Sequence, residues 1–112
     1  MMLPIDTVAF ARGVHNGYRN EVLTTVNDHN VHISVMDEPF RWHFHPNTDE
    51  TFLTLEGTLV IDFAEGPVHL HAGQMLTVRA GTRHRTRPGG ARSVNLTVER
   101  EDSETVFCDG PV

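Results

Sequence analysis

The sequence predicts an all-β domain built from antiparallel strands. Apolar side chains alternate with polar ones at the two-residue period of half-buried strands, as in Leu59, Ile61 and Phe63. Gly, Pro, Asn and Asp interrupt the chain about every ten residues, the spacing of strands joined by tight turns. No stretch has the apolar spacing of a long helix. A length of 112 residues suits a single domain, and we expect its barrel core at about residues 21–108, after an N-terminal arm at 1–20.

Ten strands are expected between these turns. One of them has a single apolar face, made by Val94, Leu96 and Val98, which is expected to be buried. The segment Thr51–Leu55 is apolar on both faces, which predicts a second covered side and, for so small a barrel, a homodimer. The expected strands are Val22–Val26, Val31–Met36, Arg41–His45, Thr51–Glu56, Thr58–Phe63, Val68–His71, Met75–Arg79, His84–Arg87, Val94–Glu99 and Thr105–Cys108.

Composition excludes several classes of partner. Fifteen acidic residues against nine Lys and Arg give a net charge of −6, and no basic stripe runs along the chain, so nucleic acid is not an expected partner. No apolar run reaches the length of about 18 residues that a membrane span needs, so no membrane partner is expected. The N-terminus lacks a signal-peptide pattern, and the single cysteine, Cys108, suits a reducing compartment, so a cytoplasmic location is predicted.

Arginines gather in the second half of the chain. They form either a rim that attracts an anionic small molecule or a solvated face that balances nearby acids, and the second interpretation is favoured. The cluster consists of Arg79, Arg83, Arg85, Arg87 and Arg92.

Four residues have the chemistry and spacing of a transition-metal site. His43 and His45 are separated by one residue, so on a strand both point to the same face, about 6.6 Å apart along the chain. A turn follows, and Glu50 then begins the next strand, from which its carboxylate can reach the same ion. His84 opens a strand in the second half of the chain, and only the fold can bring it close.

A second His-x-His pair warns against spacing as the sole evidence. His69 and His71 have the same separation, but no acid is placed to complete a site around them. We therefore expect them to face solvent. His15, His29 and His32 lie among polar turn residues and are expected to be exposed as well.

The longer pattern around the first pair resembles the two motifs of the cupin superfamily. The first motif, G-x5-H-x-H-x(3,4)-E-x6-G, is met by His43, His45, Glu50 and Gly57, with Asp37 in place of the leading Gly. The second, G-x5-P-x-G-x2-H-x3-N, is met by Gly73, Gly81 and His84, with Arg79 in place of Pro and Pro88 in place of Asn. The resemblance covers roughly residues 30–99 and is closest to the small single-domain cupins of bacteria.

This resemblance implies a double-stranded β-helix, or jelly-roll barrel, with one divalent transition metal ion held by His43, His45, Glu50 and His84. Three imidazoles and one carboxylate suit Fe, Mn, Ni, Co, Cu or Zn, which the sequence does not distinguish. Such an ion keeps open positions for water, substrate or dioxygen. No catalytic base is identifiable.

Strand parity suggests which side chains line the pocket. Phe52 and Thr54 follow Glu50 on its face, and Thr86 follows His84. Arg79 is placed near the barrel mouth, in contact with substrate or in solvent.

Three functions are compatible with this site. The favoured one is a metal-dependent enzyme of the oxygenase, isomerase or decarboxylase type that acts on a small polar or aromatic molecule. The alternative is a non-catalytic module that binds a small molecule or a metal. A barrel with a vestigial site and a purely structural role is weighed lowest.

Overall fold

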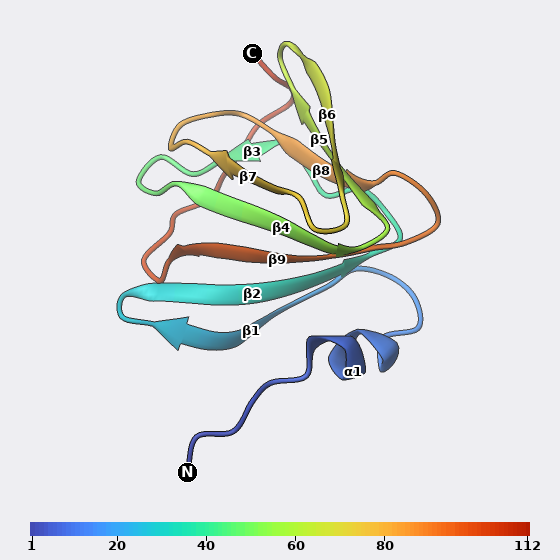
Figure 1. Ribbon diagram of the computed structural model, residues 1–112. Helices are drawn as coiled ribbons and strands as arrows, with labels where there is room; N and C mark the ends of the chain where they lie inside the picture. Colours follow the sequence, from blue (N-terminus) through green and yellow to red (C-terminus); the bar gives the residue numbers. More distant parts are fainter.

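Ten strands form the three antiparallel sheets of the protein, and one short helix precedes them. A computed structural model describes all 112 residues (Figure 1). The elements are α1 (Thr7–Arg12), β1 (Arg19–Val26), β2 (His29–Met36), β3 (His43–Phe44), β4 (Glu50–Glu56), β5 (Thr58–Phe63), β6 (Gly66–His71), β7 (Met75–Val78), β8 (Arg85–Pro88), β9 (Ser93–Arg100) and β10 (Val106–Phe107). The all-β prediction is confirmed.

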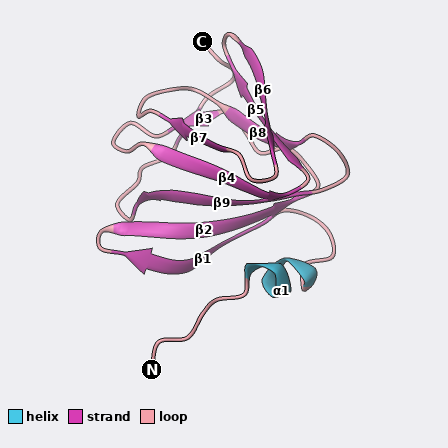
Figure 2. Cartoon of the chain, in the orientation of Figure 1, coloured by secondary structure: helices cyan, strands magenta, loops and turns pink.

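The strands are ordered β1-β2-β9-β4-β7 in a five-stranded sheet, β6-β5-β8 in a three-stranded sheet and β10-β3 in a small pair. Neighbours along the chain form hairpins, such as β1 with β2 and β5 with β6, whereas β9 crosses over to lie between β2 and β4. Figure 2 shows the dominance of strands over helix. This arrangement is the expected jelly-roll barrel.

Every predicted strand is present, and only the ends differ. Thr58–Phe63 has the predicted bounds, whereas the segment expected at Arg41–His45 contracts to the two residues of β3. His84 lies just before β8, because its backbone forms an isolated bridge with His43 while β8 pairs with β5.

An apolar core lies between the large and the small sheet. Its buried members come from both: Met36, Phe52 and Val78 from the large sheet, and Leu59, Ile61 and Leu70 from the small one. Leu59 and Ile61 alternate on β5 as predicted and are fully buried. Burial of this apolar area is the main stabilising contribution between the sheets.

The outer face of the large sheet is also apolar, which corrects one expectation. Val94 lies on this face and packs against Ala11 and Val14 of the N-terminal arm, while Val98 on the same face is 37% exposed. Asn95 and Thr97, on the other face of β9, are the residues that point into the barrel. The expected burial of this apolar face holds for Val94, which is 1% exposed, but the opposite face of β9 is buried as well, because Asn95 and Thr97 point into the barrel.

Met75 is a large apolar side chain at the surface, 64% exposed. It pairs with Leu53 on the outer face of β7, which is an edge strand. Separately, none of the protein's helices has the length and apolarity needed to cross a membrane.

Gly57 forms the turn between β4 and β5 in a conformation that only glycine adopts easily. Its φ is +71°, and a Cβ atom there would overlap the carbonyl oxygen of Arg92. Gly73 also has a positive φ, +88°, but open space surrounds it. The first glycine therefore meets a steric and a conformational constraint, and the second only a conformational one.

We expect Gly57→Ala to destabilise the protein more than Gly73→Ala. The left-handed conformation costs about 1–2 kcal/mol for a residue with a side chain at either position, and Gly57→Ala adds the displacement of the Arg92 backbone. Urea unfolding of both variants measures the difference. Equal loss of stability in the two variants would contradict the close approach at Gly57.

Candidate metal centre

The first two ligand candidates leave β3 on one face. His43 and His45 are 5% and 7% exposed, and Phe44 between them points away, with the Arg83 guanidinium 5.6 Å from its ring centre. The strand parity predicted from the sequence is thus what directs both imidazoles inward.

His84 reaches this strand through a reciprocal pair of backbone hydrogen bonds. The His43 N–H donates to the His84 carbonyl at 3.0 Å, and the His84 N–H donates to the His43 carbonyl at 2.9 Å. Gly81, with φ +82°, donates from its N–H to the His45 carbonyl at 2.8 Å. The glycine turn and the bridge together bring the distant motif onto β3.

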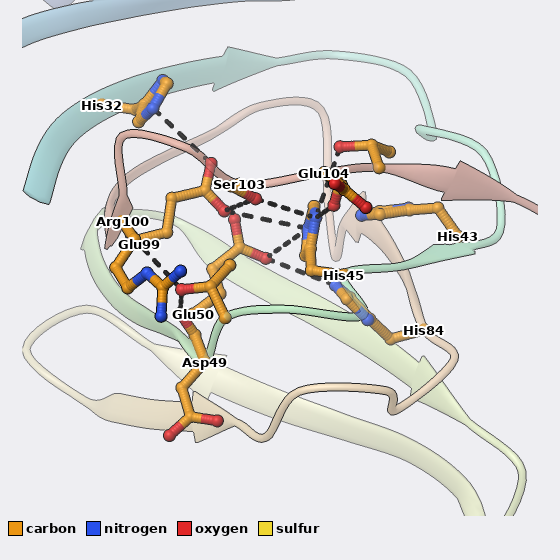
Figure 3. A network of polar contacts seen from close by, with 12 residues as sticks. His32, His43, His45, Asp49, Glu50, His84, Glu99, Arg100, Ser103 and Glu104 are labelled. Carbon is orange, nitrogen blue, oxygen red and sulfur yellow. Dashed lines mark hydrogen bonds and ion pairs between the residues drawn. The ribbon is translucent and has the colours of Figure 1, made fainter.

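Glu50 completes the cluster from the first residue of β4. Its Oε1 lies 3.3 Å from Nε2 of His45 and 3.4 Å from Nε2 of His84 (Figure 3). The four candidate ligand atoms of His43, His45, Glu50 and His84 all lie within 4.8 Å of one another. The structure therefore brings all four predicted ligands together.

Backbone carbonyls hold each imidazole by its Nδ1 atom. His43 contacts the Arg41 carbonyl at 2.7 Å, His45 the Glu104 carbonyl at 2.9 Å and His84 the Thr82 carbonyl at 2.9 Å. A carbonyl only accepts hydrogen bonds, so each Nδ1 carries the proton. In the neutral ring, Nε2 then presents its lone pair to the centre of the cluster, as a metal ligand requires.

The atoms at the centre fit a metal ion. Nε2 of His45, Nε2 of His84 and Oε1 of Glu50 are buried, and apart from their contacts with one another at 3.3 and 3.4 Å they have no hydrogen-bond partner. Leaving such groups unpaired is costly, and an ion between them would satisfy all three. Three nitrogens and a carboxylate suit a divalent transition ion rather than Ca²⁺ or Mg²⁺.

Burial and mutual charge shift the ionisation of the cluster. Burial lowers the pKa of His43 to about 4, so this ring is neutral at pH 7. Burial also opposes charge on His45, but its contacts with the Glu50 carboxylate outweigh that effect and raise the pKa of His45 to about 9. The same contacts overcome the burial of Glu50 and lower its pKa. In the absence of metal, Glu50 is therefore paired with an imidazolium.

A cavity of about 310 Å³ opens beside the cluster. His43, His45 and Glu50 lie on its wall, and Met36 and Phe52 of the core form part of its lining. Among the predicted pocket residues, Phe52 and Thr86 line it. A small molecule in this cavity would lie directly against the ligand cluster.

Two predicted pocket residues lie elsewhere. Thr54 has the correct parity but lies further along β4 than Phe52; it is completely buried and does not line the cavity. Arg79 follows β7, its side chain is 76% exposed, and it forms an ion pair with Asp49 at 3.1 Å. Parity specifies the face of a strand on which Thr54 lies but not its depth along the strand. Of the two expected positions for Arg79, contact with substrate or exposure to solvent, the structure has the solvent-exposed one.

The arginine cluster does not assemble around the cavity. Arg85 and Arg87 both pair with Asp62 on the small sheet, and Arg92 pairs with Glu56. No Arg or Lys is among the residues that line the cavity. The favoured interpretation, arginines balancing nearby acids, describes these contacts, and the anion-attracting rim is not formed.

The other histidines differ in outcome. His69 and His71 are exposed, as predicted. His32, expected to be exposed, is half-buried on β2, with Nε2 3.6 Å from Oε1 of Glu99. The strand expected at Val31–Met36 already included this residue, and in the structure it lies opposite Thr97 of β9.

Glu99 is the main residue that the sequence analysis missed. Its carboxylate lies on the cavity wall, with Oε2 3.9 Å from Nε2 of His45 and 3.3 Å from the Ser103 hydroxyl, which donates to it. Burial, and then the negative charge of Glu50, raise the pKa of Glu99 to about 7. The available signal was the polar face of β9, which carries Asn95 and Thr97 on the same side as Glu99.

Comparison with known proteins agrees with this geometry. Residues 29–98 match the Cupin domain family. A curated relative, the uncharacterized protein YdbB of Bacillus subtilis (strain 168), is 41% identical over 105 residues, which are 93% of this chain and 92% of that protein.

Two solved structures share the fold. A cupin-2 domain-containing protein from Shewanella frigidimarina has 26% identity and a TM-score of 0.80, over 87% of this chain and 94% of that chain. An uncharacterized conserved protein with a double-stranded β-helix domain from Klebsiella pneumoniae has 16% identity and a TM-score of 0.81, over 98% of this chain and 100% of that chain. These similarities establish the barrel, whereas the metal centre depends on the positions of this chain's own side chains.

Removing His43 should abolish metal binding, whereas removing His71 should not. His43→Ala deletes one of four converging ligands, and His71→Ala deletes an exposed imidazole of the other His-x-His pair. Elemental analysis after supplementation with each candidate metal should give about one ion per chain for the wild type and His71→Ala, and a small fraction for His43→Ala. Equal metal content in the two variants would refute the assignment of the site.

Metal binding should release a proton near neutral pH. Below pH 9 the His45 ring is protonated in the metal-free protein, and the incoming ion must displace that proton. Apparent Zn²⁺ affinity should therefore rise by up to about tenfold per pH unit between pH 6 and pH 8, with release of about one proton at pH 7. Calorimetric titration in two buffers of different ionisation enthalpy measures this release. An affinity independent of pH would contradict the Glu50–His45 pairing.

Proposed function

The chain belongs to the cupin domain family, and from this premise we propose that it is a metal-dependent enzyme acting on a small molecule. The ion is held by His43, His45, Glu50 and His84. The reaction is of the oxygenase, isomerase or decarboxylase type. The substrate is a small polar or aromatic molecule.

The observation that carries this proposal is the open side of the ligand cluster. Three of its four members lie on the wall of the cavity, while His84 is fully buried behind them. A structural metal site is closed by protein ligands, whereas a catalytic one keeps positions for substrate. An ion held by these four residues would supply a Lewis acid next to the cavity, able to polarise an oxygen atom of a molecule bound there.

The protein's own groups prepare this site. The three carbonyl contacts at Nδ1 hold the imidazoles in one tautomer and one orientation, so little reorganisation is needed on metal uptake. Phe40 and Phe107 lie against His43, with ring centres 5.1 Å and 6.3 Å from its own, and form an apolar surface on that side.

Glu99 is placed to hold a proton beside the reacting atoms. Apart from the ligand Glu50, it is the only acid on the cavity wall. Its distance of 3.9 Å from Nε2 of His45 leaves it outside the ligand cluster but within reach of a molecule bound there. This position fits a general acid or base.

The homodimer and the cytoplasmic location stay predictions. Leu55 and Met75, on the outer face of the large sheet, are exposed apolar side chains that a partner subunit would cover.

Metal-reconstituted protein should turn over at least one member of a panel of sugars, phenols and keto acids. Protein loaded separately with Fe, Mn, Ni, Co, Cu or Zn is tested for dioxygen consumption and for product by NMR. Glu50→Ala should lose metal and activity. Glu99→Gln should keep metal but lower kcat by about 100-fold, whereas the matched surface variant Glu101→Gln should match the wild type.

The enzyme proposal would be overturned if a ligand bound tightly but was recovered unchanged from the protein loaded with each of the metals. The protein would then be a non-catalytic binding module of the same fold.

A further inference from the structure

The cavity wall has an uneven distribution of polar and apolar groups. One side is aromatic, with Tyr18 and Phe40 stacked at 5.4 Å between ring centres and Phe107 6.0 Å from Phe40. The other side is the inward face of β9, which presents Asn95, Thr97 and Glu99. A ligand that fills the cavity must touch both sides.

Asn95 is the group on the polar side that most needs a partner. Only 1% of the residue is exposed, and its Oδ1 has no hydrogen-bond partner. Its Nδ2 reaches only the Leu96 carbonyl, at the long distance of 3.5 Å. A buried carbonyl oxygen without a donor is unfavourable, and this residue is one of those that line the cavity.

Glu99 adds further acceptor capacity on the same strand, two positions beyond Thr97. Its carboxylate contacts Ser103 on one side and lies 3.6 Å from His32 on the other. Figure 3 shows the Glu99 side chain extending toward the Glu50 and His45 pair. The charged side chains on the cavity wall, apart from the histidines, are therefore both carboxylates.

Cationic side chains that a phosphate group would need are absent from this wall. No Arg or Lys lines the cavity. Arg41 stacks on Phe107, 4.0 Å from its ring centre, without lining the cavity, and Arg100 is paired with Asp102 at the surface. Phosphate recognition normally uses such groups.

We propose that the cavity selects a small neutral or cationic molecule with an apolar portion and hydrogen-bond donor groups, and disfavours phosphorylated or other polyanionic molecules. This inference rests on the proposed function, since it names the substrate class of the same site. A volume of about 310 Å³ corresponds to about ten water molecules, the size of a single ring with a short polar arm. The ring lies against the aromatic side, and the donor group meets Asn95 and Glu99.

Four probes with one ring and different polar groups test this selection: benzylamine, benzyl alcohol, benzoate and phenyl phosphate. Each is titrated at pH 8 into the purified protein and into chelator-treated protein, with amide NMR shifts on β9 as the readout. In the chelator-treated protein, benzylamine and benzyl alcohol should bind at least about fivefold more tightly than phenyl phosphate. Metal is removed in this arm because an ion attracts anions by itself.

Variants of the cavity wall test whether its side chains cause the preference among the probes. Glu99→Gln keeps an acceptor but removes the charge, so the preference for benzylamine over benzyl alcohol should fall by about fivefold, while Glu101→Gln on the outer surface leaves it unchanged. Asn95→Leu should weaken both probes. If Asn95→Leu does not fold, the nearly isosteric Glu99→Gln still decides the result.

The proposal would be overturned if phenyl phosphate bound as tightly as benzylamine to the chelator-treated protein. It would also be overturned if phenyl phosphate bound to the wild type and the Arg41→Gln variant lost that binding. Failure of all four probes in both preparations would also overturn it. These outcomes are separate from failure of the enzyme proposal, because metal content and turnover are measured independently. A protein that retains metal but prefers phenyl phosphate keeps the proposed function and loses this substrate class.

Discussion

The reciprocal backbone hydrogen bonds between His43 and His84 are the constraint on which the site depends. They join two segments separated by 41 positions in the numbering and place the two imidazoles 4.4 Å apart between ring centres. Gly81 supports this bridge by bonding to His45 in a conformation unfavourable for other residues. Without this bridge, the second motif would lie on its own strand, and Glu50 would face only two imidazoles.

Strand β9 links the core, the cavity and the N-terminal arm. Its inward face buries Ser93, Asn95 and Thr97, an arrangement that costs free energy unless these groups find partners. Its outward face carries Val94, which packs with the arm. Arg92 holds the arm in place by donating to the carbonyls of Ala11 and Val14. The arm therefore supplies apolar burial on the outer face, which leaves the inner face available for polar groups.

The sequence was informative about strands and ligands because both follow local rules. A period of two residues located β5 with its observed bounds, and His-x-His with a following Glu identified three ligands within eight residues. The residues of the pocket were less predictable. Thr54 has the correct parity but lies too deep in the barrel. Glu99 was missed because the apolar side chains that predicted its strand, such as Val94, lie on the opposite face.

By itself, the sequence determined the all-β class, the turn glycines and the identity of the four ligand candidates, because strand period, turn residues and the spacing within each of the two motifs are local properties of the chain. Only the tertiary structure decided that His84 meets His43, that Glu99 shares the cavity and that Arg79 does not. Those outcomes depend on how strands distant in sequence pair and how deep each residue lies between the sheets. The periodicity of a single strand specifies neither the partner strand nor the depth.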